Sequence, residues 1–218
     1  MSKATEKAYE TIRAAILSGR YAPGAHLKEE ELVGLCGVSR TPVRDALRRL
    51  AADRYVVARR NQGTYVNEWS LDDIACIFEM RALLEGYAAE RAASRITPDQ
   101  LARVDKAWRD IEDVLSKDSL DIPEFLRANR VFHTTIIEAA CNRQLRETID
   151  QLVQPPIVNR TAMTYSRQDL RQSNDHHGLI LSALKTGDAV TACTAMRQHL
   201  LTSYQNFLRN YDRSLGQE

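Results

Sequence analysis

The sequence predicts a mostly α-helical protein in two parts, a small N-terminal module of three helices and a hairpin followed by an all-helical bundle. Apolar residues recur at helical spacing over most of the chain, and strand-like composition is confined to residues 55–66. The charge also changes sign near Trp69. Residues 1–69 contain 12 Lys and Arg against 8 Asp and Glu, whereas the remainder contains 18 against 21. We therefore expect one domain over residues 1–69 and a second over residues 70–218.

The composition is that of an ordinary folded protein, with 218 residues, 44% hydrophobic and 27% charged. No apolar run reaches the roughly 18 to 20 residues needed to cross a bilayer, and the first residues lack the apolar segment of a signal peptide. The four cysteines are widely spaced without a C-x-x-C pair, which argues against a disulfide framework or a thiolate zinc site. We expect a cytoplasmic protein with no membrane partner.

Two helices are expected before residue 40. Tyr9, Ile12 and Ile16 recur at helical spacing, and Ser18-Gly19 ends that pattern. The second helix has an acidic first turn, Glu29–Glu31, which suits the positive end of a helix dipole, and it ends at Gly37.

The third helix begins at Thr41-Pro42, because proline is tolerated in a first helical turn. One face is apolar and consists of Val43, Ala46, Leu47 and Leu50. The opposite face has a row of arginines four residues apart, Arg40, Arg44 and Arg48. A hairpin follows, with strands at 55–58 and 64–66 and a polar turn ending in Gly63.

This order of elements is typical of a winged helix-turn-helix. A basic helix of this size fits the DNA major groove, where arginine binds guanine O6 and N7 in a bidentate manner, while the wing approaches the backbone or minor groove. The alternative is a solvated helix face with ordinary surface arginines. The row, the short gap between helices and the basic hairpin together favour DNA binding.

Two runs, 37–50 (GVSRTPVRDALRRL) and 61–66 (NQGTYV), closely resemble the DNA-binding domain of GntR-family bacterial transcription regulators. Asp45 stands where Glu is usual in that family. The resemblance implies that Arg40 and Arg44 contact bases and that Thr41 and nearby residues hold phosphates. It also implies that Gly63 lets the wing backbone approach the groove. With Arg48 in the same row, these residues are the expected contacts with double-stranded operator DNA.

From Leu71 onward the pattern is helical and predicts an all-α bundle. Pro155-Pro156 is expected to break or kink one segment before another helical stretch towards Tyr165. The expected helices lie at about 71–94, 98–115, 122–141, 145–153, up to 165, 169–185 and 188–211.

Three histidines are expected to converge inside this bundle. His133 shares a helix face with Asn129, four residues earlier. His177 lies ten residues before Gly187 and His199 twelve after it, so an antiparallel helix pair turning there places both imidazoles at a similar height. Three imidazoles and an amide oxygen form a plausible site for zinc, manganese, nickel or cobalt. The alternative is that the histidines are hydrogen-bonded core residues.

The second half also resembles the ligand-binding FCD domain of the FadR-like branch of that family, over most of residues 71–212. The matching stretches include 81–85, 129–133, and 175 through 188 to 200. In metal-containing members, Asp or Asn and three His occupy the positions of Asn129, His133, His177 and His199, and Asn is the less usual first ligand. We take zinc as the first choice, with manganese or nickel possible.

In this family the metal is thought to hold the carboxylate of a small effector, which here implies an organic or sugar acid. Arg81, Arg160 and Asn174 are the candidate effector-binding residues. For Arg81, an ion pair with a neighbouring Glu is the equal alternative.

These observations predict a metabolite-responsive transcription regulator, a repressor acting as a homodimer, and not an enzyme. Two-fold symmetry is expected because a single recognition helix reads too few bases. One rival is a metal-dependent hydrolase, against which the sequence lacks an H-E-x-x-H motif and a nucleophile context. The other is a regulator with an organic ligand and purely structural histidines.

Overall fold

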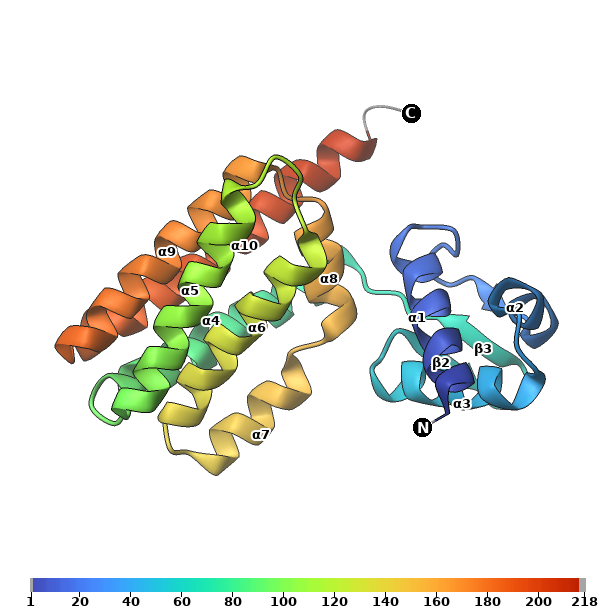
Figure 1. The fold of residues 1–218 in the computed structure, drawn as a ribbon, viewed down its shortest axis with the longest axis horizontal. Helices are drawn as coiled ribbons and strands as arrows, with labels where there is room; N and C mark the ends of the chain where they lie inside the picture. Colours follow the sequence, from blue (N-terminus) through green and yellow to red (C-terminus); the bar gives the residue numbers. More distant parts are fainter. Residues whose placement is uncertain (1, 216–218) are drawn as a thin grey trace. The chain divides into compact units, whose positions relative to one another are not determined.

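The computed structural model describes residues 2–215, with side chains up to residue 211. The chain folds into two compact units (Figure 1). The first contains the residues up to Asp73 together with Gln154–Arg160, and the second contains Ile74–Val153 and the residues from Thr161 onward. The assignment of 154–160 to the first unit differs from our expected division at residue 69, which remains a prediction.

The first unit contains three helices and a small antiparallel sheet. The strand order is β1-β3-β2, with Val57 opposite Tyr65 and His26 opposite Tyr65 on its other side. Strand β1 was not predicted, because two residues are too few to show a strand pattern. The elements are α1 (Lys3–Leu17), β1 (His26–Leu27), α2 (Glu29–Cys36), α3 (Arg40–Ala52), β2 (Val56–Arg59) and β3 (Gly63–Val66).

The apolar faces of the three helices close over the core of the first unit. Ile12, Leu32 and Leu50 are completely buried there. The segment 154–160 is joined to this unit by hydrogen bonds. Asn159 Nδ2 donates to the Tyr55 hydroxyl at 2.5 Å, and the Trp69 indole donates to a side-chain oxygen in that segment at 3.0 Å.

The second unit is helical throughout the described residues. Several helices begin with side-chain caps, including Thr97 with a capping box to Gln100, Asp121 and Ser166. Its helices, some of which begin or end in the first unit, are α4 (Leu71–Ala93), α5 (Pro98–Ser116), α6 (Ile122–Ala139), α7 (Arg143–Leu152), α8 (Pro155–Met163), α9 (Arg167–Thr186) and α10 (Ala189–Leu215).

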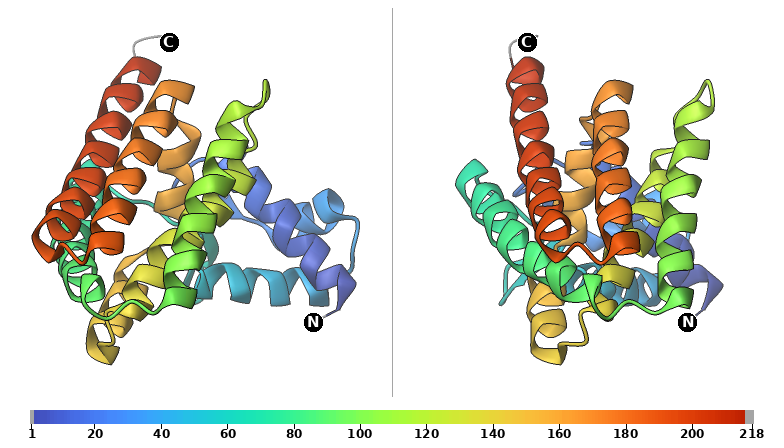
Figure 2. Two further views of the ribbon diagram at one scale, coloured as in Figure 1. Left: turned by 60° about the vertical axis from the view of Figure 1, so that its left-hand side comes forward. Right: turned by 90° about the vertical axis from the view of Figure 1, so that its left-hand side faces the viewer.

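Helices α9 and α10 run antiparallel along each other (Figure 2). They meet at Gly187, whose φ of +72° is a left-handed conformation that glycine adopts without strain. The core between the helices is apolar around Phe132, Ile180 and Met196. It also encloses several polar side chains, among them the three predicted histidines.

The predicted fold class is confirmed, since a helix-turn-helix with a small sheet precedes a helical domain. Within the described residues, no helix is both long and apolar enough to cross a membrane.

Candidate DNA-binding and metal-binding sites

The arginine row lies on the outer face of α3. The side chains of Arg40, Arg44 and Arg48 are 67%, 56% and 78% exposed, and Thr41 is also exposed. The apolar stripe on the opposite face is buried in the core of the first unit. The helix therefore presents its cations to solvent, as binding in a DNA groove requires.

Two of these arginines face the acidic first turn of α2, which the sequence reasoning did not anticipate. Arg44 Nε donates to both carboxylate oxygens of Glu29, at 2.9 and 2.8 Å. Arg40 lies 3.8 Å from a carboxylate oxygen of Glu30. Exposed ion pairs of this kind contribute little stability, so breaking them costs little free energy.

The turn of the wing requires glycine at position 63. Gly63 has a φ of +104°, and a Cβ there would lie 2.5 Å from His26 Nε2. His26 is stacked on Tyr65, and the Arg59 guanidinium covers the same tyrosine ring at 4.3 Å. Any larger residue at position 63 would have to displace this stack, so the tight turn depends on glycine.

The three predicted histidines come together inside the second unit. His133 lies on α6, His177 on α9 and His199 on α10, and one ligand nitrogen of each lies within 4.8 Å of the others. All three are buried, with exposures of 6%, 0% and 3%. Phe132, completely buried, packs against the His177 ring with centroids 4.3 Å apart.

Each histidine keeps one nitrogen without a partner. His133 Nε2, His177 Nε2 and His199 Nδ1 are buried and make no hydrogen bond in the described residues. Buried polar atoms are normally paired, because an unpaired one has lost its hydration without compensation. Three converging imidazole nitrogens are a donor set suited to a divalent cation such as zinc. The chemistry of the cluster therefore fits a metal ion.

The environment favours the neutral form of His177 and His199. Burial lowers the pKa of His177 well below its ordinary value, and the nearby imidazoles of His133 and His176 lower it further. Burial, followed by His177 and His133, lowers the pKa of His199 in the same way. Neutral imidazole is the form that binds metal, so these two side chains can act as ligands at neutral pH.

The other predicted site residues are placed as follows. Asn129 is half-buried on α6, one turn before His133. Arg81 is buried on α4 and donates from Nε to Glu85 at 2.7 Å, which is the ion pair considered as the alternative. Asn174 is completely buried, and its Oδ1 lies 3.3 Å from His177 Nδ1. Arg160 lies on α8, within the segment that belongs to the first unit.

Two residues that lie beside the three histidines, Glu85 and His176, were not predicted from the sequence to be there. Glu85 Oε2 lies 2.7 Å from His133 Nδ1, although the two residues are 48 positions apart in the chain. Burial alone would raise the pKa of Glu85, but the positive charge of Arg81 and the contact with His133 lower it to about 2. The ring of His176 lies 6.2 Å from that of His199. The i, i+4 spacing of Arg81 and Glu85 signals their own ion pair, but no local spacing places Glu85 beside His133.

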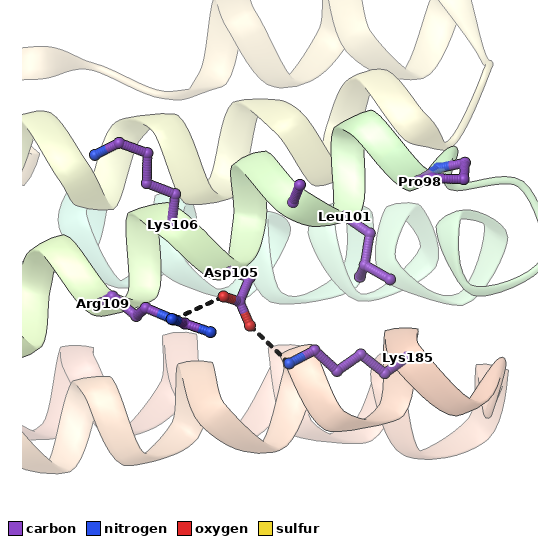
Figure 3. A pocket seen from close by; sticks show the side chains of 7 residues that line it. Pro98, Leu101, Asp105, Lys106, Arg109 and Lys185 are labelled. Carbon is purple, nitrogen blue, oxygen red and sulfur yellow. Dashed lines mark hydrogen bonds and ion pairs between the residues drawn. The ribbon is translucent and has the colours of Figure 1, made fainter.

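A surface groove of about 470 Å³ is lined by residues of α5 and by Lys185 near the end of α9 (Figure 3). None of its lining residues is a histidine. Its charges are already paired, since Asp105 accepts from Lys185 at 2.6 Å and from Arg109 at 2.8 Å. Lys106 donates to a neighbouring carboxylate at 2.7 Å. The groove therefore offers an anionic ligand no unpaired cation among its described lining residues.

Comparison with known proteins identifies the family. The sequence matches bacterial regulatory proteins of the gntR family over residues 4–66 and the FCD domain over residues 76–202. It is 30% identical over 201 residues to the HTH-type transcriptional repressor RspR of Escherichia coli (strain K12), covering 89% of this chain and 85% of that one. The chain belongs to the GntR family of bacterial transcriptional regulators.

A second curated relative and a solved structure are also similar to this chain. The gluconate operon transcriptional repressor of Bacillus subtilis (strain 168) is 28% identical over 88% of this chain and 79% of its own. The solved structure of E. coli McbR/YncC has the same fold, with a TM-score of 0.71, 24% identity and coverage of 98% and 100% of the two chains. The predictions of a DNA-binding GntR regulator with an FCD ligand-binding domain, and of a protein that is not an enzyme, are confirmed.

The buried imidazoles predict that the metal-free regulator loses stability in mild acid. The pKa values of His177 and His199 are lower in the folded state than their ordinary value of 6.5, so the unfolded chain binds protons first as the pH falls. Stability from this source is present above pH 6.5 and decreases below it. Denaturant unfolding of the chelator-treated protein at about pH 7.5 and 5.5 measures the decrease, and His177→Gln should show a smaller one. Equal decreases in the two proteins would contradict the prediction.

Proposed function

We propose that the regulator is a metabolite-responsive repressor whose effector is a small carboxylate held at a divalent cation in the second unit. The observation that carries this proposal is the set of three unpartnered, buried imidazole nitrogens. Support for a repressor comes from the relatives, since RspR and the gluconate operon regulator are both named repressors. The latter name also supports a sugar acid as the class of effector.

The cation would be held by Asn129, His133, His177 and His199, with zinc as the first choice and manganese or nickel as alternatives. When bound, the cation supplies a positive charge that attracts a carboxylate. The protein supplies the selectivity for the cation through three buried imidazoles, which come from three different helices. This chain provides only imidazole and amide ligands in the proposed set, so an anionic effector would bring the first negative charge to the cation.

Arg81 and Asn174, which both lie in the second unit, remain our candidates for contacts with the effector. Arg81 has its Nε committed to Glu85, so its terminal nitrogens are the part proposed to meet an anion. Asn174 donates to Glu112 and lies beside His177, which favours a contact made indirectly through that imidazole. A thermal-shift screen of sugar acids such as gluconate, with and without Zn²⁺, tests the effector class.

We propose a homodimer because one recognition helix reads too few bases for a specific operator. A surface on α4 supports a second copy as partner. Met80, Leu83 and Tyr87 are 46%, 52% and 43% exposed and lie three and four residues apart, so they share one helix face. Apolar side chains exposed at this spacing are typical of a helix that packs against another.

Removing one imidazole should abolish stable metal binding, because the remaining ligands cannot close the site. We expect His177→Ala to lose the Zn²⁺ that the parent retains, and Asn129→Asp to bind it more tightly by adding a negative charge. Elemental analysis and chelator competition measure both effects. His26→Ala, in the first unit, is the matched control and should keep full metal content. Full metal and unchanged effector affinity in His177→Ala would favour the rival with structural histidines.

Arg44 is expected to read a base. Arg44→Ala should cost about 1 to 3 kcal/mol per half-site and relax base preference, because a bidentate contact to guanine is lost. Arg59→Ala in the wing should weaken binding to all sequences alike and reduce its salt dependence. Binding to duplexes selected from a randomised library, at several salt concentrations, separates the two effects. Parental selectivity in Arg44→Ala would show that α3 is not the recognition helix.

The α4 face predicts the oligomeric state. Leu83→Asp should shift the protein from dimer to monomer in sedimentation experiments, because it places a charge in the proposed interface. Leu179→Asp is the matched control, since that leucine is similarly exposed at 56% but lies on α9. A dimer of unchanged strength in Leu83→Asp would exclude this face.

A further inference from the structure

A buried carboxylate lies directly behind one of the proposed metal ligands. Glu85 on α4 is 1% exposed, and its Oε2 is 2.7 Å from His133 Nδ1. Its other oxygen, Oε1, accepts from Arg81 Nε at 2.7 Å, and Arg81 is itself 6% exposed. Both oxygens of the carboxylate are therefore used, one by a cation and one by an imidazole.

We infer that Glu85 is a positioning residue of the metal site, which fixes the tautomer and the ring orientation of His133. An ionised carboxylate accepts hydrogen bonds only, so the proton of the neutral imidazole lies on Nδ1. The lone pair is then on Nε2, which is buried and makes no hydrogen bond to any described residue. This inference rests on the proposed metal site.

Arg81 makes this arrangement possible. A carboxylate so deeply buried would be costly without a counter-charge, and would otherwise take up a proton and stop acting as an acceptor. Arg81 supplies the positive charge one helical turn before Glu85. Its guanidinium therefore supports the metal ligand through Glu85, in addition to any contact with an effector.

The second ligand has a different support. His177 Nδ1 faces the Asn174 amide oxygen at 3.3 Å, and the amide nitrogen of Asn174 donates to Glu112. The partner of His177 is thus an uncharged amide oxygen, and its distance of 3.3 Å is longer than the 2.7 Å between His133 and Glu85. Of these two contacts, the one between Glu85 and His133 is expected to contribute more to metal affinity. A carboxylate that is hydrogen-bonded to a metal-binding histidine raises the basicity of that ligand.

The test is a titration of the metal-free proteins with Co²⁺, followed by its visible d–d absorption. Glu85→Gln should bind Co²⁺ about 10 to 100 times more weakly than the parent and show an altered absorption band. If Glu85→Gln leaves Arg81 without a counter-charge and does not fold, the double variant Arg81→Met/Glu85→Gln removes the ion pair as a unit. It should show the same loss of affinity.

Asp169→Asn is the matched control. Asp169 is a buried carboxylate that is also paired with an arginine, Arg209, but it has no hydrogen bond or ion pair to the histidine cluster among the described contacts. Its loss can lower the stability of the fold, but should leave Co²⁺ affinity and the absorption band unchanged. Parental affinity and spectrum in a folded Glu85 variant would overturn the inference. A parent protein that takes up no Co²⁺ would overturn the proposed metal site itself, and the inference with it.

Discussion

The constraint that most shapes the second unit is the burial of three imidazoles, each with one nitrogen that makes no hydrogen bond to any described residue. Each buried, unpaired nitrogen costs free energy, and the surrounding apolar side chains cannot recover it. Protonation would be a worse solution, because three neighbouring positive charges would repel one another in a medium of low dielectric constant. In the proposed metal-bound state, a cation would satisfy all three nitrogens at once and would stabilise the folded state.

Much of this arrangement could be predicted from the sequence. The positions of His177 and His199 on either side of Gly187 determine their height in an antiparallel pair, and Asn129 and His133 share a helix face by spacing alone. The structure brings the three histidines together as expected. The arginine row on the recognition helix is likewise a property of local spacing, and it is exposed as expected.

What could not be predicted depends on contacts between distant parts of the chain. The contact of Glu85 with His133 requires the packing of α4 against α6, for which the pattern of apolar residues gives no register. The segment 154–160 belongs to the first unit through contacts such as Asn159 with Tyr55, 104 positions away. Strand β1 exists only because β3 offers it an edge, since two residues have no stable strand structure of their own. The proximity of Glu29 to Arg44 depends in the same way on how α2 meets α3.

The helix that supports the proposed metal site is also the one that leaves the DNA-binding unit. Helix α4 begins at Leu71, among the last residues before the division after Asp73, and continues without a break to Glu85. Because His133 is in hydrogen-bond contact with Glu85, a ligand that moves His133 also changes the contact between His133 and α4. If the effector and DNA each favour a different position of α4, each weakens the binding of the other. By thermodynamic linkage, the factor by which an effector weakens DNA binding then equals the factor by which DNA weakens effector binding. A measured inequality between those two factors would mean that a further equilibrium, such as dissociation of the dimer, takes part in the response.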